Sequence, residues 1–170
     1  MFVAVWPPEE VLARLRALDR PELPGLRWST EDQWHVTLVF LGEVAEADVG
    51  PLGQAVRDAA SGLDAGLTAE LGPATRRLGR AVLCLPVAGL DEAAAAVRDR
   101  TAAVVADPDP RPFAGHLTLA RARGGRPVPG PLVGRPCRAA WTVEALTLVR
   151  SETGPEGAAY ESLVTAPLGR

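Results

Sequence analysis

The chain contains two copies of one tetrapeptide, His-x-Thr-Leu, and this repeat constrains the fold more than any other feature. The copies span residues 35–38 and 116–119, so they stand 81 positions apart, and their histidines are the only two in the 170 residues. In a β-strand, alternate side chains point to the same face, so each His would project with its Thr while the neighbouring Val and Leu residues enter a packed layer. Two strands of this kind predict one site with two matching halves.

The residue types in the repeat suit proton transfer at a phosphate. Imidazole is the only side chain whose ordinary pKa lies near neutrality, so a facing pair can supply one proton donor and one proton acceptor in the same turnover. Each threonine hydroxyl can donate a hydrogen bond to an anion held between the histidines. A single histidine is more often structural, but two in matched motifs favour catalysis. We therefore expect His35, Thr37, His116 and Thr118 to form the site.

The rest of the chain shows both helical and strand patterns. Apolar residues at helical spacing predict helices at about 7–20, 49–59 and 90–104. Apolar or alternating runs predict strands at 2–6, 34–41, 67–71, 81–85, 113–120, 141–150 and 160–165. We expect a turn at the arginine-containing segment 76–80 and a surface loop at the Gly/Pro-rich segment 124–136.

Each half of the chain offers a helix followed by a strand that begins with the motif, which indicates an internal duplication. Outside the tetrapeptides the halves show no convincing residue-by-residue match. Mixed elements without strict βαβ alternation predict an α+β fold rather than a doubly wound sheet. The length fits a single compact domain over residues 1–170.

Composition excludes some classes of function and location. A net charge of −3 and a pI near 5.4 argue against a surface that coats a nucleic-acid backbone, although a small phosphorylated ligand or one RNA end is compatible. Cys84 and Cys137 have no CxxC spacing and are expected to be free buried thiols. The opening apolar run is too short for a secretory signal, and no run of about eighteen apolar residues occurs. We therefore expect a cytoplasmic protein without a membrane span.

Several segments, taken in order, resemble the two-histidine phosphoesterase superfamily. These segments are Arg27-Trp28, residues 34–43, residues 112–121, residues 148–151 and Tyr160. Within the superfamily the chain is most similar to the bacterial and archaeal RNA 2′,3′-cyclic phosphodiesterases, also called 2′-5′ RNA ligases. The likeness spans nearly the whole chain. One departure is Gly115, which precedes the second motif where the family usually has Pro.

The resemblance implies a bilobal α+β fold. Two lobes related by a pseudo-twofold axis would line a central cleft with antiparallel sheets and carry their helices outside. It also implies hydrolysis of a 2′,3′-cyclic phosphate at an RNA end to a 2′-phosphate, without metal or cofactor, and with 2′-5′ ligation as the reverse reaction. The partners would be RNA ends that carry the cyclic phosphate, tRNA fragments among them, bound by a monomer.

By the same resemblance, each motif residue has a role. His35 would donate a proton to the leaving 3′ oxygen, His116 would accept a proton from water, and Thr37 and Thr118 would hydrogen-bond the phosphate. The near twofold symmetry leaves the two histidine roles interchangeable from the sequence alone.

Three further residues are candidates for substrate binding. The guanidinium of Arg121 suits phosphate, but strand alternation turns it away from the face of His116 unless the strand ends or bulges there, and a structural ion pair is the other interpretation. The same alternation predicts that Phe40 packs in the core. Phe113 and Tyr160 are candidates to stack on a terminal base, although most aromatic residues are expected in the core.

The sequence is also compatible with other functions. A metal site could use the histidines with Glu31 or Asp32, but no carboxylate accompanies His116 in the second half. A binding module for RNA ends would need the cleft without proton transfer. An enzyme of the same fold could act on a small cyclic nucleotide, an ADP-ribose cyclic phosphate or a 2′-5′ linkage, because substrate choice depends on loops such as 124–136.

Overall fold

The computed structural model describes residues 1–105, 111–154 and 157–169. The helices in these ranges are α1 (Glu9–Arg16), α2 (Glu46–Gly62), α3 (Asp91–Thr101) and two short 3-10 helices, η1 (Glu31–Gln33) and η2 (Gly130–Leu132). The strands are β1 (Phe2–Val5), β2 (Leu26–Trp28), β3 (Val36–Phe40), β4 (Thr68–Leu71), β5 (Arg76–Leu78), β6 (Val82–Ala88), β7 (His116–Ala122), β8 (Ala139–Thr142), β9 (Ala145–Gly154) and β10 (Gly157–Pro167). The predicted α+β class is confirmed.

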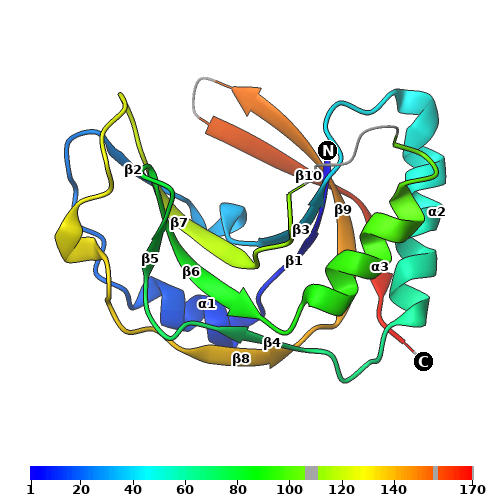
Figure 1. Cartoon of the computed structure of the whole chain (residues 1–170), viewed down its shortest axis with the longest axis horizontal. Coiled ribbons are helices and arrows are strands. Elements are labelled where there is room, and N and C mark those ends of the chain that lie inside the picture. The colour runs from blue at the N-terminus through cyan, green and yellow to red at the C-terminus, as the bar shows by residue number, and fades with distance from the viewer. Residues whose placement is uncertain (106–110, 155–156, 170) are drawn as a thin grey trace.

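The strands that carry the two motifs lie side by side in the middle of one curled sheet. The strand order is β10-β9-β1-β3-β7-β6-β4-β8, with β2 beside β7 and β5 beside β6, and paired neighbours are antiparallel. The boundary between β3 and β7 divides the sheet into two halves, each with one motif strand. Figure 1 shows the central strands with the β9–β10 hairpin on one side of them and β2 and β5 on the other.

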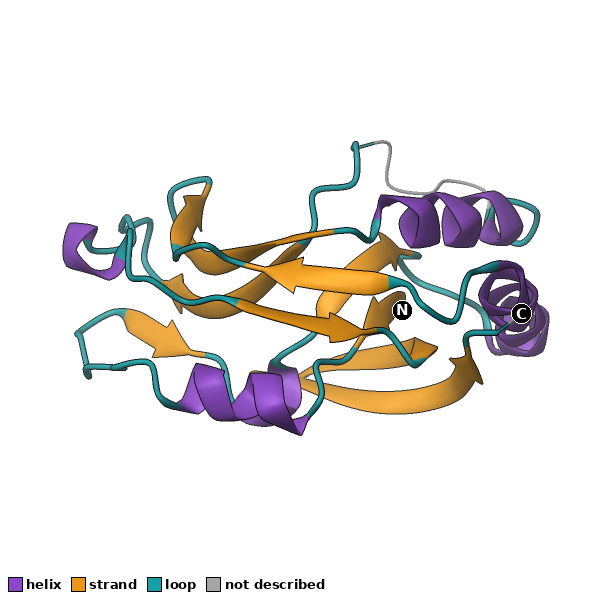
Figure 2. Ribbon diagram, turned by 90° about the horizontal axis from the view of Figure 1, so that it is seen from below, coloured by secondary structure: helices purple, strands orange, loops and turns teal. Residues whose placement is uncertain are grey.

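The helices bury narrow apolar faces. In α1, Val11 and Leu15 are buried, while Glu9 and Glu10 occupy the first turn, where negative charge is favourable. Helices α2 and α3 pack against each other at one end of the molecule, where α2 also contacts β9 and β10 (Figure 1). Figure 2 shows α1 on one side of the strands and α3 on the other. No helix in the described ranges combines the length and the apolarity that a bilayer crossing demands.

Three elements differ from the sequence prediction. The sequence does not predict strand β2, because its three residues pair only with the end of β7 and are too few to show a clear periodicity. The expected turn at 76–80 begins with β5, which pairs with β6. The expected strand 141–150 is divided, because β8 pairs with β4 in one half of the sheet and β9 pairs with β1 in the other. One continuous apolar run therefore serves both halves.

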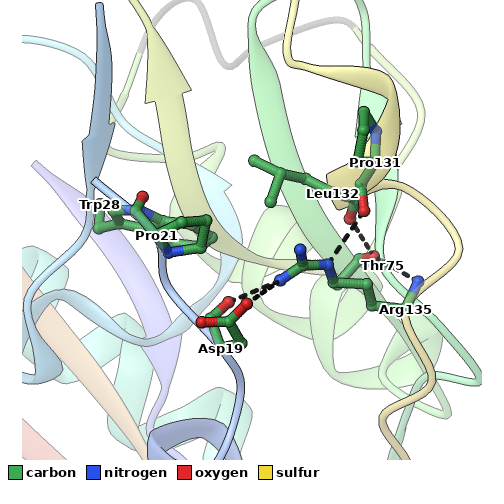
Figure 3. Close-up of polar contacts among 7 residues, drawn as sticks. All are labelled: Asp19, Pro21, Trp28, Thr75, Pro131, Leu132 and Arg135. Carbon is green, nitrogen blue, oxygen red and sulfur yellow. Dashed lines mark hydrogen bonds and ion pairs between the residues drawn. The ribbon is translucent and has the colours of Figure 1, made fainter. Parts of the chain in front are cut away.

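The Gly/Pro-rich segment 124–136 is a loop with one 3-10 turn, as expected, and a polar network anchors it (Figure 3). The buried Thr75 hydroxyl donates to the carbonyl of Leu132 at 2.6 Å and accepts from the backbone N–H of Arg135 at 3.0 Å. The Arg135 guanidinium donates to the backbone carbonyl of Asp19 at 2.8 Å. The loop is therefore tied both to the start of β5 and to the segment after α1.

Candidate active site

One cavity of about 330 Å³, which we call the cleft, is lined by both copies of the motif. Strands β3 and β7 pair directly at Val36 and Leu117, the residues that follow the two histidines. This pairing brings the motif side chains of the two strands to one surface. The cleft contains all four side chains that the sequence analysis expects there: His35, Thr37, His116 and Thr118.

The two histidines are held by the same kind of backbone contact. Nδ1 of His35 lies 2.9 Å from the carbonyl oxygen of Gln33, and Nδ1 of His116 lies 2.7 Å from that of Ala114. A carbonyl oxygen only accepts, so each Nδ1 carries the proton that it donates, and Nε2 is the unprotonated nitrogen of the neutral ring. Nε2 of His35 lies 3.1 Å from the hydroxyl oxygen of Thr37, which can donate to it. In both halves, Nε2 is therefore the nitrogen available for proton transfer.

Aromatic rings enclose His35. Its ring stacks on Phe2 with centroids 4.8 Å apart, and Tyr160 meets it edge-on at 5.1 Å. Trp6 adds a third ring at 5.2 Å. Burial raises the pKa of the Tyr160 hydroxyl, so this group stays neutral and can donate a hydrogen bond near the cleft.

This enclosure controls the protonation of His35. Burial lowers the pKa of His35 from 6.5 to about 4, although the carbonyl of Gln33 opposes the change by accepting from Nδ1. Electrostatic interactions with His116 and Arg121 make smaller contributions in the same direction as burial. In the free protein, His35 is therefore neutral at pH 7.

A β-bulge in β3 brings Phe40 into the cleft. Thr37 and Val39 pair with consecutive residues of β1, so Leu38 is an extra residue in the strand. One extra residue reverses the alternation beyond it, so Leu38 and Val39 are both buried, whereas Phe40 is 49% exposed and lines the cleft. The prediction that Phe40 packs in the core is therefore wrong.

The same bulge recurs in β7, where the pairing with β6 skips Leu119. Leu119 and Ala120 are buried, and the exposed Arg121 lines the cleft. Strand alternation turns Arg121 away from the face of His116 unless β7 bulges, and the extra residue Leu119 is such a bulge. Among the described residues its guanidinium has no hydrogen bond or ion pair, so the alternative of a structural ion pair has no support there. Phe40 and Arg121 each stand five positions after a motif histidine.

A second arginine lies beside Arg121. Strand β2 pairs with the end of β7 so that Arg27 is directly opposite Arg121, and both line the cleft. The indole of Trp28 donates to the carbonyl of Pro21 at 3.0 Å, which fixes β2 in place (Figure 3). No Asp or Glu occurs among the described residues that line the cleft. No pattern in the sequence gives Arg27 a role, and its only signal is that Arg27-Trp28 is one of the segments that carry the family resemblance.

Of the two aromatic candidates, only Tyr160 lines the cleft. Phe113 packs against the core and lines a neighbouring cavity of about 190 Å³. The two cavities meet at Thr37, Phe40 and His116, which line both.

The carboxylates considered as metal ligands lie outside the cleft. Oε1 of Glu31 lies 2.5 Å from Nη2 of Arg16. Glu31 and Asp32 line a separate depression beside Trp6 and Trp34. In the parts of the chain that the structure describes, no group of three or more His, Cys, Asp or Glu side chains is placed to hold a metal ion. The geometry therefore gives no support to a metal site built from these carboxylates.

The amino-terminal third of the chain matches a family model. Residues 5–66 match the model described as LigT like Phosphoesterase. This segment includes the first motif, the helix before it and the helix after it. No match was found among curated protein sequences.

Solved structures are similar over nearly the full length. The crystal structure of TT0787 of Thermus thermophilus is 30% identical with a TM-score of 0.82, and the match covers 99% of this chain and 98% of that one. The crystal structure of E. coli LigT in its apo form is 25% identical with a TM-score of 0.77, covering 99% and 96%. E. coli LigT complexed with 3′-AMP is 26% identical with a TM-score of 0.73, covering 99% and 96%.

Proposed function

Since the chain belongs to the LigT-like phosphoesterases of the two-histidine phosphoesterase superfamily, we propose that it hydrolyses the 2′,3′-cyclic phosphate at an RNA end to a 2′-phosphate. The observation that carries the proposal is the placement of two histidines, each with Nε2 available, in one cleft. A general acid and a general base must both reach the reacting phosphate, and a shared cleft meets that need.

The proposed reaction adds one water and breaks one phosphorus–oxygen bond. The water oxygen forms a bond to phosphorus while the bond between phosphorus and the 3′ oxygen breaks. Nε2 of His116 accepts the proton that water loses, and Nε2 of His35 gives its proton to the 3′ oxygen. The 2′ oxygen keeps the phosphate, so the product is a 2′-monoester.

The remaining polar groups of the cleft neutralise the phosphate oxygens. Thr37 and Thr118 supply neutral hydroxyl donors, and Arg27 and Arg121 supply charged donors. Donors that are already in place when charge develops are an effective way to stabilise a transition state. The aromatic ring of Tyr160, also in the cleft, supplies a surface for a base.

The donor role of His35 requires that substrate binding protonate it. A phosphodiester carries one negative charge, and a negative charge beside an imidazole favours the imidazolium form. The bound phosphate therefore raises the pKa of His35 from its value of about 4 in the free protein. His35 is therefore protonated mainly when substrate is bound.

Nucleotide binding by the relatives supports a nucleotide as ligand. E. coli LigT has been crystallised with 3′-AMP, with NADP+, with ATP and with phosphate. All four ligands carry phosphate, and three carry a nucleoside. A phosphorylated RNA terminus, including that of a tRNA fragment, combines both parts in one ligand.

The test is incubation with an RNA oligonucleotide that ends in a 2′,3′-cyclic phosphate, with a chelator present. We expect a 2′-monoester as product, and each of His35→Ala and His116→Ala should reduce the rate by about 10²- to 10⁴-fold. A double variant that keeps the wild-type rate would disprove the proposal, and a 3′-monoester would disprove its regiochemistry. Faster turnover of a cyclic mononucleotide or an ADP-ribose cyclic phosphate would assign the same chemistry to a small substrate.

A further inference from the structure

Positive charge is concentrated in the half of the sheet that carries the second motif. Residues 71–90 and 111–143 contain nine of the eighteen arginines and no Asp or Glu, whereas the rest of the chain contains nine arginines and all 21 acidic residues. The two arginine-rich segments form β5, β6, β7 and β8 and the loop 124–136. The net charge of −3 is therefore the sum of a strongly basic part and a strongly acidic part.

Three turns meet beside the end of β7 and present Arg80, Arg123 and Arg126, which we call the arginine tip. Arg123 directly follows β7, and its N–H donates at 2.8 Å to the carbonyl of Gly25, in the turn before β2. The side chain of Arg126 lies against the same glycine, with Cδ 3.4 Å from the position of an added Cβ. The carbonyl of Arg80, in the turn between β5 and β6, accepts from the N–H of Val128 at 2.8 Å. Figure 1 shows β2, β5 and the loop after β7 on the side of the central strands away from α2 and α3.

The arginine tip continues the positive charge of the cleft. Arg27 and Arg121 line the cleft, and Arg123 stands two residues beyond Arg121, about 7 Å further along an extended chain. Arg80, Arg123 and Arg126 are exposed, and within the described ranges their guanidinium groups have no hydrogen bond or ion pair. None of these three lines the cleft. One ligand therefore contacts the cleft and the arginine tip together only if it extends out of the cleft.

The other side of the cleft is acidic. In the strand order, β1 and β10 lie on one side of β3 and β7, and β2 lies on the other. Tyr160 of β10 and Met1, which precedes β1, both line the cleft. The carboxylate of Asp32 interacts electrostatically with Tyr160, and that of Glu43 with the amino group of Met1. A polyanion that leaves the cleft is therefore repelled on this side and attracted on the side of the arginine tip.

We infer that the arginine tip binds the RNA strand on the 5′ side of the reacting terminus. This inference rests on the proposed function. The strand leaves the cleft past Arg27 and Arg121, and its next phosphates lie against the arginine tip. Contacts to phosphate carry no sequence information, so this binding depends on strand length and salt rather than on base identity. The arginine tip therefore favours a polynucleotide end over a mononucleotide that carries the same cyclic phosphate.

The test compares two substrates and three variants. Adenosine 2′,3′-cyclic monophosphate occupies the cleft alone, whereas an RNA oligonucleotide with the same cyclic terminus extends to the arginine tip. The tip variant combines Arg80→Gln, Arg123→Gln and Arg126→Gln, and the lysine variant combines Arg80→Lys, Arg123→Lys and Arg126→Lys. The charge control combines Arg14→Gln, Arg57→Gln and Arg100→Gln, because these exposed arginines lie on α1, α2 and α3 and do not line the cleft.

Steady-state kinetics at several salt concentrations should separate the two substrates. At low salt the tip variant should raise KM for the oligonucleotide by about tenfold or more, and should change its kcat and both constants for the mononucleotide by less than about twofold. The slope of log KM against log salt concentration should fall by about 2, because each phosphate contact of a single strand contributes about 0.7. The lysine variant should keep most of the slope, since it keeps the charge.

The charge control should match the wild type. An equal rise in KM in the tip variant and the charge control would show that net charge alone is responsible, and would overturn the inference. A mononucleotide affected as strongly as the oligonucleotide would also overturn it.

A binding measurement gives a second readout that needs no turnover. Fluorescence anisotropy with an oligonucleotide that ends in a 2′-phosphate should show the same loss of affinity in the tip variant, and unchanged affinity would refute the role of the arginine tip. If no cyclic phosphate is hydrolysed, the proposed function fails, and the anisotropy comparison still decides whether the arginine tip binds RNA.

Discussion

Arg27 on β2 and Arg121 on β7 lie directly opposite each other, and both side chains line the cleft. Like charges at directly opposite positions of a sheet are destabilising, by an amount on the order of 0.2–1 kcal/mol. No Asp or Glu stands among the described residues that line the cleft. An anion between the two guanidinium groups would remove the repulsion, which is the physical reason to expect phosphate there.

The first prediction separates binding from stability at Arg121. Arg121→Gln should weaken binding of adenosine 2′-monophosphate by about tenfold or more, because a charge-assisted hydrogen bond contributes roughly 1.5–3 kcal/mol. The free energy of unfolding should stay constant or rise by a few tenths of a kcal/mol, because the repulsion with Arg27 is lost. Calorimetric titration and urea unfolding measure the two effects. Arg123→Gln is the control, since Arg123 is exposed and outside the cleft, and equal weakening by both variants would point to general charge attraction.

The second prediction concerns stability as a function of pH. His35 has a pKa of about 4 in the folded protein and an ordinary value of 6.5, so the unfolded chain binds the proton more tightly. The contribution to the free energy of unfolding is fully present above about pH 6.5 and is lost as the pH falls from there to about 4. Its size is on the order of 3 kcal/mol.

Urea unfolding of the wild type and of His35→Gln at several pH values measures this contribution. Carboxylates titrate in both proteins, so the difference between the two curves isolates His35. We expect the variant to lose less stability than the wild type between pH 6.5 and pH 4. Parallel curves over that interval would show that burial does not shift the pKa of His35.

The third prediction distinguishes the acid from the base. A 4-nitrophenolate leaving group departs without a proton, so a 4-nitrophenyl phosphodiester needs the base but not the acid. His35→Ala should therefore lose about 10²- to 10⁴-fold on the cyclic phosphate and far less on the nitrophenyl ester, whereas His116→Ala should lose activity on both. Initial rates of both variants with the two substrates measure this difference. If His116→Ala spared the nitrophenyl ester and His35→Ala did not, His116 would be the acid and His35 the base.

The fourth prediction concerns Gly115, which stands before the second motif. A Cβ added there would lie 2.2 Å from the carbonyl oxygen of Val87, whose own N–H donates to the carbonyl of Gly115 at 2.9 Å. The carbonyl oxygen of Val87 belongs to the backbone and cannot rotate away. Gly115→Ala should therefore destabilise the protein by about 1–3 kcal/mol. Glycine at this position therefore permits a close approach of β6 and the start of β7.

Thermal unfolding compares Gly115→Ala with Gly130→Ala. Gly130 has no atom within 4 Å of an added Cβ, so the control should unfold close to the wild-type temperature. A control that loses as much stability as Gly115→Ala would contradict the steric explanation.

Alternation along a strand is a local rule, and it succeeds for the motifs but fails directly after them. The rule correctly groups His35 with Thr37, because two residues on one strand share a face whatever the strand pairs with. It fails for Phe40 because Leu38 is an extra residue relative to β1. A bulge belongs to a pair of strands, so the residues that cause it lie elsewhere in the chain.

The sequence by itself determined that two His-Thr pairs would project from strands of an α+β fold, because strand periodicity and the residue types are properties of short segments. Only the tertiary structure decided which other groups join them. Arg27 comes from a three-residue strand, and the enclosure of His35 combines Phe2 and Tyr160 from opposite ends of the chain. These partners depend on strand order and register, which are set by packing between distant segments and leave no periodic signal near the motifs.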